Sequence, residues 1–343
     1  MPGQDLYVRS LGVHLPEPVS TEQAVAEGRL DAEDVAGGEL TGVRVAGDVP
    51  APELAVRAAR QLFERVGVDP SVVDLILYAS VWHQGPDGWG PQSYVQRHLG
   101  GEALAVELRH GCTGVFSALE LASGFLRGNP QSSDALLLGA ENFGTPLIDR
   151  WRATGGGMLV GDGASALLLG KEPGFAKLLW VDCIAVPDLE AMHRSGEPMF
   201  PPGATIGRQL DFSLRNQHFL KHEGEQMRPL LMKAHQDLYD RWTAATGLGV
   251  EDVTYLSYMN TSRTTIEKRL LPLLGLPAER TTWDVGRDIG HLGVSDQLVA
   301  LDRLLQDGRI GPGDHYLMYG LGPGMTVAGA MFEITDVPSW TRR

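Results

Sequence analysis

The chain has 343 residues, a formal net charge of −14, 43% hydrophobic residues and 21% charged residues, which is typical of a soluble globular protein. The acidic excess argues against nucleic acid or an anionic membrane as partner, because phosphate binding needs clustered Lys and Arg. No apolar run reaches the ~18 residues of a membrane span, and the N-terminus does not resemble a signal peptide. With two cysteines, Cys112 and Cys183, a disulfide scaffold or multi-cysteine metal site is excluded, and we expect a cytoplasmic protein.

The first half of the sequence alternates predicted strands and helices. Short apolar runs at residues 72–80, 104–108, 135–140 and 164–170 predict strands, and residues 92–99 and 116–126 predict helices. Continuous apolar runs favour strands that are buried on both faces. This alternation predicts an α/β protein with mostly parallel strand pairing and helices that cover the sheet.

The second half repeats this order. Strands are expected at residues 253–259, 281–285, 315–319 and 325–334, and helices at residues 237–246, 265–274 and 297–305. Between the halves, residues 187–228 lack clear periodicity and are either a substrate-lining insertion or a plain connection. We therefore predict a duplicated chain with an N-terminal half over residues 1–172 and a C-terminal half over residues 173–343.

Two turns occupy matching places in these halves, each between a predicted strand and a predicted helix. Residues 111–115 read Gly-Cys-Thr-Gly-Val and residues 290–294 read Gly-His-Leu-Gly-Val. If the halves pack about a pseudo-twofold axis, Cys112 and His291 face each other. A cysteine at a helix start meets the positive end of the helix dipole, which favours the thiolate. Asp296 can reach back to the imidazole, so the three residues can act as nucleophile, base and orienting acid.

Each of these residues also has a plain structural interpretation. Cys112 can be a small core residue, His291 a turn residue with satisfied hydrogen bonds, and Asp296 a partner of its own helix dipole. A glycine-rich turn at residues 319–326 includes Gly322 and Gly324, and its backbone N–H groups can serve an oxyanion hole or only an ordinary turn. No dinucleotide or P-loop fingerprint is present, so we expect no tightly bound cofactor.

Several motifs together resemble the thiolase-like condensing enzymes, most closely the β-ketoacyl-ACP synthase III group. They are Gly-Cys-Thr-Gly at Cys112, Gly-Asp-Gly-Ala at residues 161–164, Asp-Gly-Arg-Ile at residues 307–310 with Gly313, and Gly-Pro-Gly at residues 322–324. The resemblance covers nearly the whole chain. It implies a duplicated five-layer α/β/α/β/α fold, a homodimer, and a ping-pong mechanism through an acyl thioester on Cys112. The implied substrates are acyl-CoA or acyl-phosphopantetheine thioesters, with an acyl carrier protein as the implied partner.

The chain departs from the condensing members at the residues that would stabilise an enolate. In those members a His and an Asn do this together. The family's His falls in residues 257–263, which contain no histidine here, and its Asn falls where His291 stands. The middle glycine of the family's oxyanion turn is Pro323, which has no N–H. The set resembles that of the synthase-III-like acyltransferases of secondary-metabolite pathways, such as polyketide and antibiotic biosynthesis. These transfer acyl groups without condensation to a sugar hydroxyl or other small-molecule acceptor, to another carrier or to a starter position.

The resemblance suggests four further binding residues. Asn260 would bind an acceptor or carbonyl oxygen, and Trp89 stands where the family has an aromatic residue that closes the partner subunit's acyl pocket. Arg150 or Arg152 falls near a family arginine that contacts the adenine of coenzyme A. Residues 21–34 lack the family's tryptophan for that adenine, which favours a carrier-protein donor. A structural role is equally compatible with Trp89 and both arginines.

Three functions follow from these observations. The leading one is an acyltransferase that works through acyl-Cys112. The second is a condensing enzyme that primes a polyketide or fatty-acid chain, with Asn260 or Tyr258 in place of the missing histidine. The third is a catalytically inactive relative that serves as a scaffold, against which the intact Cys112 argues.

Overall fold

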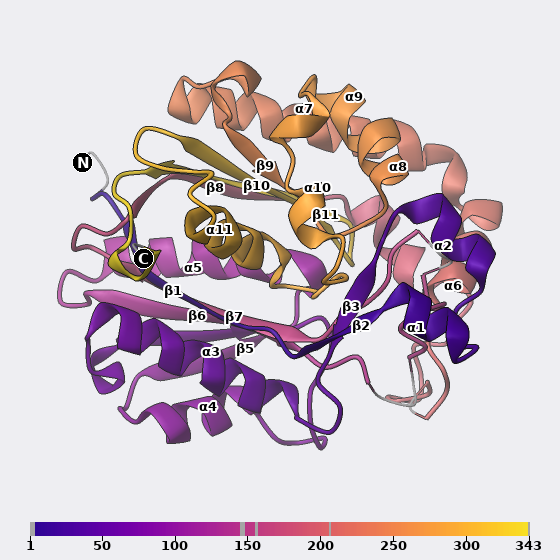
Figure 1. Cartoon of the computed structure of the whole chain (residues 1–343), viewed down its shortest axis with the longest axis horizontal. Helices are drawn as coiled ribbons and strands as arrows, with labels where there is room; N and C mark the ends of the chain where they lie inside the picture. Colours follow the sequence, from indigo (N-terminus) through magenta and orange to yellow (C-terminus); the bar gives the residue numbers. More distant parts are fainter. Residues whose placement is uncertain (1–3, 145–147, 155–156, 206, 342–343) are drawn as a thin grey trace.

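The computed structural model describes residues 4–144, 148–154, 157–205 and 207–341. The strands of the main sheet follow the order β5-β4-β6-β7-β1-β8-β11-β10-β9. Figure 1 shows the two parts of this sheet as separate layers, with helices between them and further helices outside each part, which makes five layers. The predicted α/β/α/β/α architecture is confirmed.

The N-terminal part of the sheet comes from the first half of the chain. Its strands are β5 (Leu104–Leu108), β4 (Leu75–Ala79), β6 (Asp134–Glu141), β7 (Gly163–Gly170) and β1 (Tyr7–His14). Helices α3 (Ala51–Val66) and α4 (Pro91–Leu99) cover its outer face. Apolar residues of α3 recur at helical spacing and are buried against this face, which is why this segment forms an amphipathic helix.

The C-terminal part repeats the arrangement. Its strands are β9 (Tyr255–Ser257), β10 (His315–Gly322), β11 (Thr326–Ile334) and β8 (Ala176–Ala185), and α7 (Met227–Thr246) lies outside them. The two parts join where β1 pairs with β8, through Tyr7 with Lys177 and Val8 with Ala176. The predicted boundary between residues 172 and 173 falls between β7 and β8.

The middle layer consists of α5 (Gly114–Gly128) and α11 (Asp296–Gln306), which begin just after the two matched turns. Phe116 and Leu119 of α5 and Leu298 and Leu301 of α11 are fully or almost fully buried in one core between the sheets. Helices that are covered on both sides need apolar residues around much of their circumference, as α11 has. This packing brings the starts of the two helices together.

Two predictions about the strands are wrong. Only β4 with β5, β4 with β6, and β9 with β10 pair in parallel, and the other neighbours in this sheet are antiparallel. Buried apolar runs indicate strands that are covered on both faces but do not show their direction, and the hairpin from β10 to β11 makes that pair antiparallel.

The predicted strand at residues 281–285 is reduced to a single parallel bridge between Thr281 and Leu256. The chain then turns into the short helix α10 (Trp283–Gly286), in which the N–H groups of Val285 and Gly286 donate to the carbonyl of Thr282. Gly286 permits this path because a Cβ there would stand 2.0 Å from Asn260 Oδ1.

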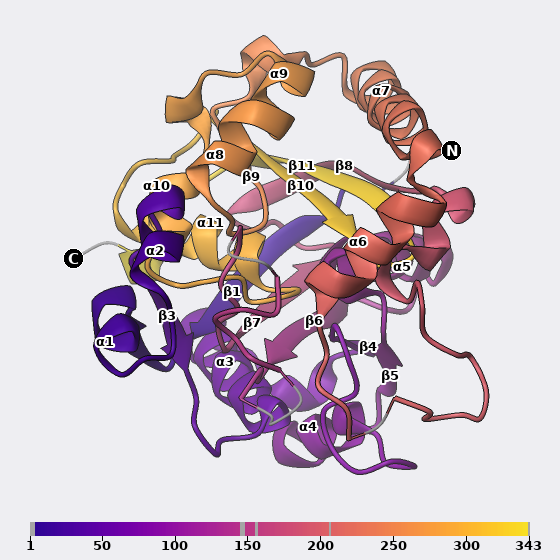
Figure 2. The ribbon, with the colours of Figure 1, turned by 90° about the vertical axis from the view of Figure 1, so that its right-hand side faces the viewer.

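The remaining elements surround one end of the molecule. They include the hairpin of β2 (Glu17–Ser20) and β3 (Gly42–Val45), and the helices α1 (Thr21–Ala26), α2 (Ala32–Gly38), α6 (Phe212–His222), α8 (Arg263–Thr265) and α9 (Leu271–Leu274). Figure 2 shows α1, α2, α6 and α8 on the side that faces the viewer. A five-residue π-helix, Ile266–Leu270, joins α8 to α9 and completes the helical segment predicted at residues 265–274.

The stretch at residues 187–228 is more regular than its sequence indicated. It contains a 3-10 helix, Pro187–His193, as well as α6, and it leads into α7, which is longer than the predicted helix at residues 237–246.

Across the described part of the chain, no helix is long and apolar enough to span a membrane. The same residues contain no cluster of His, Cys, Asp and Glu able to hold a metal ion.

Candidate active site

Cys112 lies in a tight 3-10 turn, Gly111–Thr113, directly before α5. Gly111 has a φ of +56°, and a Cβ at this position would stand 2.2 Å from Cδ of Pro323. Only glycine allows both this backbone conformation and this close approach. The glycine-rich turn between β10 and β11 therefore packs directly on the Cys112 turn, as an oxyanion hole built from both would require.

The two matched turns face each other, as their positions in the halves predicted. Cys112 Sγ lies 3.0 Å from His291 Nε2, and His291 Nδ1 donates to Asp296 Oδ2 over 2.5 Å. A carboxylate only accepts hydrogen bonds, so this contact keeps a proton on Nδ1 and directs Nε2 towards the sulfur. The side chains of His291 and Asp296 are almost completely buried, with exposed fractions of 3% and 0%.

The charges around His291 favour the imidazolium. Burial by itself lowers the pKa of His291, but the negative charges of Asp296 and the Cys112 thiolate, together with their hydrogen bonds, raise it well above the usual value. The geometry therefore places the Cys112 sulfur beside an imidazole whose orientation is fixed by a carboxylate. Such an arrangement can attack a carbonyl carbon and then exchange a proton with the incoming or departing group.

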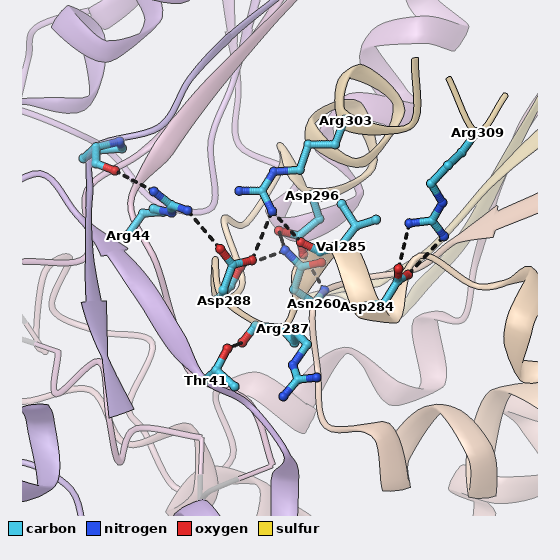
Figure 3. A network of polar contacts seen from close by, with 12 residues as sticks. Thr41, Arg44, Asn260, Asp284, Val285, Arg287, Asp288, Asp296, Arg303 and Arg309 are labelled. Carbon is cyan, nitrogen blue, oxygen red and sulfur yellow. Dashed lines mark hydrogen bonds and ion pairs between the residues drawn. The ribbon is translucent and has the colours of Figure 1, made fainter. Parts of the chain in front are cut away.

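Asn260 supports Asp296, so its amide nitrogen is engaged within the protein instead of being free for the acceptor or carbonyl oxygen predicted as its partner. Its backbone N–H donates to Asp296 Oδ2 over 2.8 Å, and its Nδ2 donates to Asp296 Oδ1 over 3.2 Å and to the Gly290 carbonyl over 2.8 Å. Leu292 N–H donates to the same carboxylate. Four hydrogen-bond donors thus converge on Asp296 and hold it against the imidazole. Figure 3 shows Asn260 beside Asp296.

Contacts with the first half of the chain fix the His291 turn. His291 N–H donates to the Leu159 carbonyl over 2.7 Å, and Gly161 N–H donates to the His291 carbonyl over 2.9 Å. Asp288, which precedes the His291 turn, forms ion pairs with Arg44 and Arg303, each at 3.0 Å (Figure 3). These ion pairs attach the segment before the turn to β3 and to α11. His291 is therefore positioned by both halves of the chain.

Arg150 belongs to this structural framework and not to the substrate site predicted for it. Its guanidinium forms a two-pronged ion pair with Asp162, at 3.1 and 3.0 Å, and only 9% of its side chain is exposed. Asp162 also accepts the N–H groups of Ala46 and Phe143. Arg152 is 45% exposed, and among the described residues its ion pairs are long, to Asp31 at 3.6 Å and to Asp149 at 3.8 Å. Its role at coenzyme A stays a prediction.

The contrast between these arginines gives a stability prediction. Arg150→Ala leaves the carboxylate of Asp162 buried without its ion-pair partner, and we expect the free energy of unfolding to fall by about 3–5 kcal/mol. Arg152→Ala removes only exposed pairs and is expected to cost about 1 kcal/mol or less. Urea unfolding of the two variants measures both values. Equal losses in the two variants would show that the Arg150 pair is not a buried structural contact.

The other predicted binding residues lie at the β10–β11 turn and in the loop before α4. Gly322 ends β10, and Gly324 lies in the turn before β11 with a φ of +78°. A Cβ on Gly322 would stand 2.5 Å from Thr113 Oγ1, so this glycine also packs on the Cys112 turn. Trp89 lies in the loop from β4 to α4, where it is 37% exposed and contacts Tyr94 edge to face. Its proposed role across a dimer stays a prediction.

Two polar residues near Cys112 were missed in the sequence. His110 contacts the Ser117 hydroxyl through Nδ1 and Thr326 Oγ1 through Nε2, which links the Cys112 turn to β11. Glu141 ends the buried strand β6 and is fully buried. The sequence could have indicated Glu141, because it places a carboxylate at the end of an otherwise apolar strand. Carboxylates without a charged partner are rarely buried in proteins.

The sequence matches two family descriptions. The family described as "3-Oxoacyl-[acyl-carrier-protein (ACP)] synthase III" matches residues 106–185, and the one described as its C-terminal part matches residues 243–334. A β-ketoacyl-[acyl-carrier-protein] synthase III of Rhizorhabdus wittichii is 31% identical over 301 residues, which cover 85% of this chain and 88% of the relative. The enzyme of the same name from Rhizobium meliloti is 29% identical, over 93% and 96% of the two chains.

Solved structures give the same architecture. A structure named ChlB3, an acyltransferase, superposes with a TM-score of 0.93 and 48% sequence identity, over 98% of this chain and 99% of that one. The 3-oxoacyl-(acyl carrier protein) synthase III of Pseudomonas aeruginosa PAO1 superposes with a TM-score of 0.76 at 23% identity, over 97% and 99%, and shows the shared fold. From its fold, its matched turns and these sequence matches, the chain belongs to the thiolase-like 3-oxoacyl-[acyl-carrier-protein] synthase III family.

Proposed function

We propose that this protein is an acyltransferase that accepts an acyl group from an acyl carrier protein or coenzyme A thioester onto Cys112. It then passes that group to a hydroxyl group of a sugar or other natural product, or to another carrier, without decarboxylative condensation. The observation that carries the proposal is the contact of Cys112 Sγ with His291 Nε2 at 3.0 Å, with Asp296 behind the imidazole. The 48% identity to a structure named as an acyltransferase supports it.

In the first half-reaction, the Cys112 thiolate attacks the thioester carbonyl and forms a tetrahedral oxyanion. When this intermediate collapses, the bond to the pantetheine sulfur breaks, and the departing thiolate takes a proton from the His291 imidazolium. The products are acyl-Cys112, a free thiol and a neutral imidazole. The N–H of Cys112 and the turn that contains Gly322 and Gly324 are the proposed oxyanion donors, and Pro323 contributes none.

In the second half-reaction, the acceptor hydroxyl gives its proton to His291 Nε2 as its oxygen attacks the acyl carbon. The bond to Cys112 breaks, which restores the thiolate beside an imidazolium. Asp296 stabilises the positive charge that forms on His291, and its contact with Nδ1 keeps Nε2 free to accept the proton. One acyl group is moved per cycle, and no proton is gained or lost by the enzyme.

The position of Asn260 argues against the condensing alternative. Decarboxylative condensation needs two donors directed at one developing enolate oxygen. The Asn260 amide donates to Asp296 and to the Gly290 carbonyl, so it is committed to protein acceptors. His291, by contrast, contacts Cys112 Sγ directly. The homodimer implied by the resemblance is also part of the proposal, since Trp89 would then lie at a partner's acyl pocket.

Intact-protein mass spectrometry tests the proposal. Incubation with a panel of acyl-CoA and acyl-carrier thioesters should add the mass of one acyl group to the wild-type protein and none to Cys112→Ala. A hydroxyl acceptor should then remove the added mass and yield an ester. Cys183→Ala is the matched control, because burial raises the pKa of Cys183 to about 12 and keeps that thiol unreactive.

The same experiment separates the other functions. With a malonyl-carrier substrate, carbon dioxide release and a product two carbons longer would refute simple transfer and favour the condensing enzyme. The absence of any mass gain with every thioester would instead support an inactive scaffold.

A further inference from the structure

A buried carboxyl group beside the catalytic pair has no place in the mechanism above. Glu141 is the last residue of β6 and has no exposed surface. Side chains alternate between the faces of a strand, and Ala135 and Leu137 of β6 belong to the core around α5 and α11. Glu141 continues that face, so its side chain enters the layer in which Cys112 and His291 lie.

The hydrogen bonds of the carboxyl group come from neutral donors. Val81 N–H donates to Oε1, and Gln84 Nε2 donates to Oε2 over 3.2 Å. Within the described part of the chain, no cation forms an ion pair with Glu141. A buried carboxylate without a cation is costly, and a carboxylic acid in the same place avoids that cost.

The carboxyl group also packs against the turn that carries the base. Gly293, two residues after His291, has a φ of +63°. A Cβ on Gly293 would stand 2.8 Å from Glu141 Cγ and 2.8 Å from Val81 Cγ2. The Glu141 side chain, at the end of β6, therefore contacts two further segments: the start of the loop after β4 and the His291 turn.

Charged and titratable groups face Glu141 from each of the surrounding elements. They are Cys112 before α5, His291 before α11, Asp162 before β7, and the phenol of Tyr78 on β4. Burial raises the pKa of Glu141 well above its usual value, and the negative charges of Cys112 and Asp162 raise it further. The Val81 N–H and the positive charge of His291 lower it, but the net shift is upward. An ionised Glu141 would repel the thiolate and would hold the proton on His291.

We propose that Glu141 is a positioning residue of the acyl-transfer site, which as an un-ionised carboxylic acid joins the loop at Val81 and Gln84 to the turn that carries His291. The inference deepens the proposed function and rests on it for its kinetic part. Its physical part, an uncharged side chain that holds two backbone segments together, rests on the contacts of Glu141 alone.

The kinetic test compares three replacements of Glu141. Glu141→Ala leaves the Val81 N–H unpaired and the His291 turn unsupported, and kcat for acyl transfer should fall about 10-fold to 100-fold while KM for the thioester stays unchanged. Glu141→Gln keeps the shape without a charge and should restore most of this loss. Glu141→Asp, one methylene shorter, should resemble the alanine variant. Glu107→Gln, on β5 at the far side of β4, is the matched control because Glu107 contacts His83, 3.4 Å away.

The thermal test does not depend on activity. A carboxyl group whose pKa is raised by folding costs the folded state stability as the pH rises above the unfolded-state pKa. The Tm of Glu141→Gln should therefore exceed that of the wild type at pH 8, and the two should converge near pH 4.5. A variant that becomes less stable than the wild type as the pH rises would show an ionised, stabilised carboxylate and overturn the proposal.

The proposed function and the role of Glu141 can be refuted independently. If wild-type Cys112 accepts no acyl group, the proposed function is wrong, and the comparison of Tm values still decides whether Glu141 is uncharged. If Cys112 is acylated and Glu141→Ala transfers the acyl group at the wild-type rate, the proposed function stands and the positioning role is refuted.

Discussion

His291→Ala should lower kcat/KM for acyl transfer by about a thousandfold to a hundred-thousandfold. The imidazole Nε2 lies 3.0 Å from Cys112 Sγ, and its loss removes both the cation beside the thiolate and the base for the acceptor hydroxyl. Steady-state kinetics with a thioester donor and a hydroxyl acceptor measure the loss. With a reactive donor, mass spectrometry should also show acyl-Cys112 that persists, because the second half-reaction lacks its base.

His110→Ala is the control for this prediction. His110 is two residues from Cys112, but its ring contacts Ser117 and Thr326, and it has no part in the proposed proton transfers. We expect its replacement to change the rate by about tenfold or less. A similar loss in both variants would show that disruption of the Cys112 turn, and not the loss of a base, reduces the rate.

Asp296→Asn should lower kcat by about a hundredfold to ten-thousandfold with little change in the fold. An asparagine that turns its N–H₂ towards Nδ1 moves the imidazole proton to Nε2, which can then no longer accept one from the acceptor. The charge of Asp296 also helps to raise the pKa of His291, so its removal lowers that pKa. Because the base must be unprotonated, the acid limb of the transfer step should move to lower pH.

Asp302→Asn is the matched control on the same helix. Asp302 pairs with Arg65 at 2.7 Å, away from the catalytic pair, so this variant should lose stability and keep the wild-type pH profile. A pH profile for Asp296→Asn that coincides with the wild-type profile would contradict the assignment of Asp296 as the partner of His291.

The amino-acid sequence determined the layered fold and the contact between Cys112 and His291. Short apolar runs can be buried on both faces only in a covered sheet, so the strands and the helices between them were predictable. The repeat of Gly-Cys-Thr-Gly-Val as Gly-His-Leu-Gly-Val placed Cys112 and His291 at equivalent turns. Asp296 follows from local spacing, because a residue in the first turn of α11 can reach back to the turn before it.

Tertiary packing decided the features that depend on distant residues. Strand direction, the helix at Trp283 and the ion pair of Arg150 all depend on partners far away in the sequence, such as Asp162 for Arg150. Asn260 looked available for substrate until Asp296 and Gly290 were found beside its amide. The position of Glu141 in the sequence did not indicate that it lies near Cys112 and His291. It lies near them because the end of β6 packs against the His291 turn. The local sequence determines which reactive side chains the chain carries and at which turns and helices they lie. Long-range contacts determine which of these side chains are engaged by other residues and which can react with a substrate.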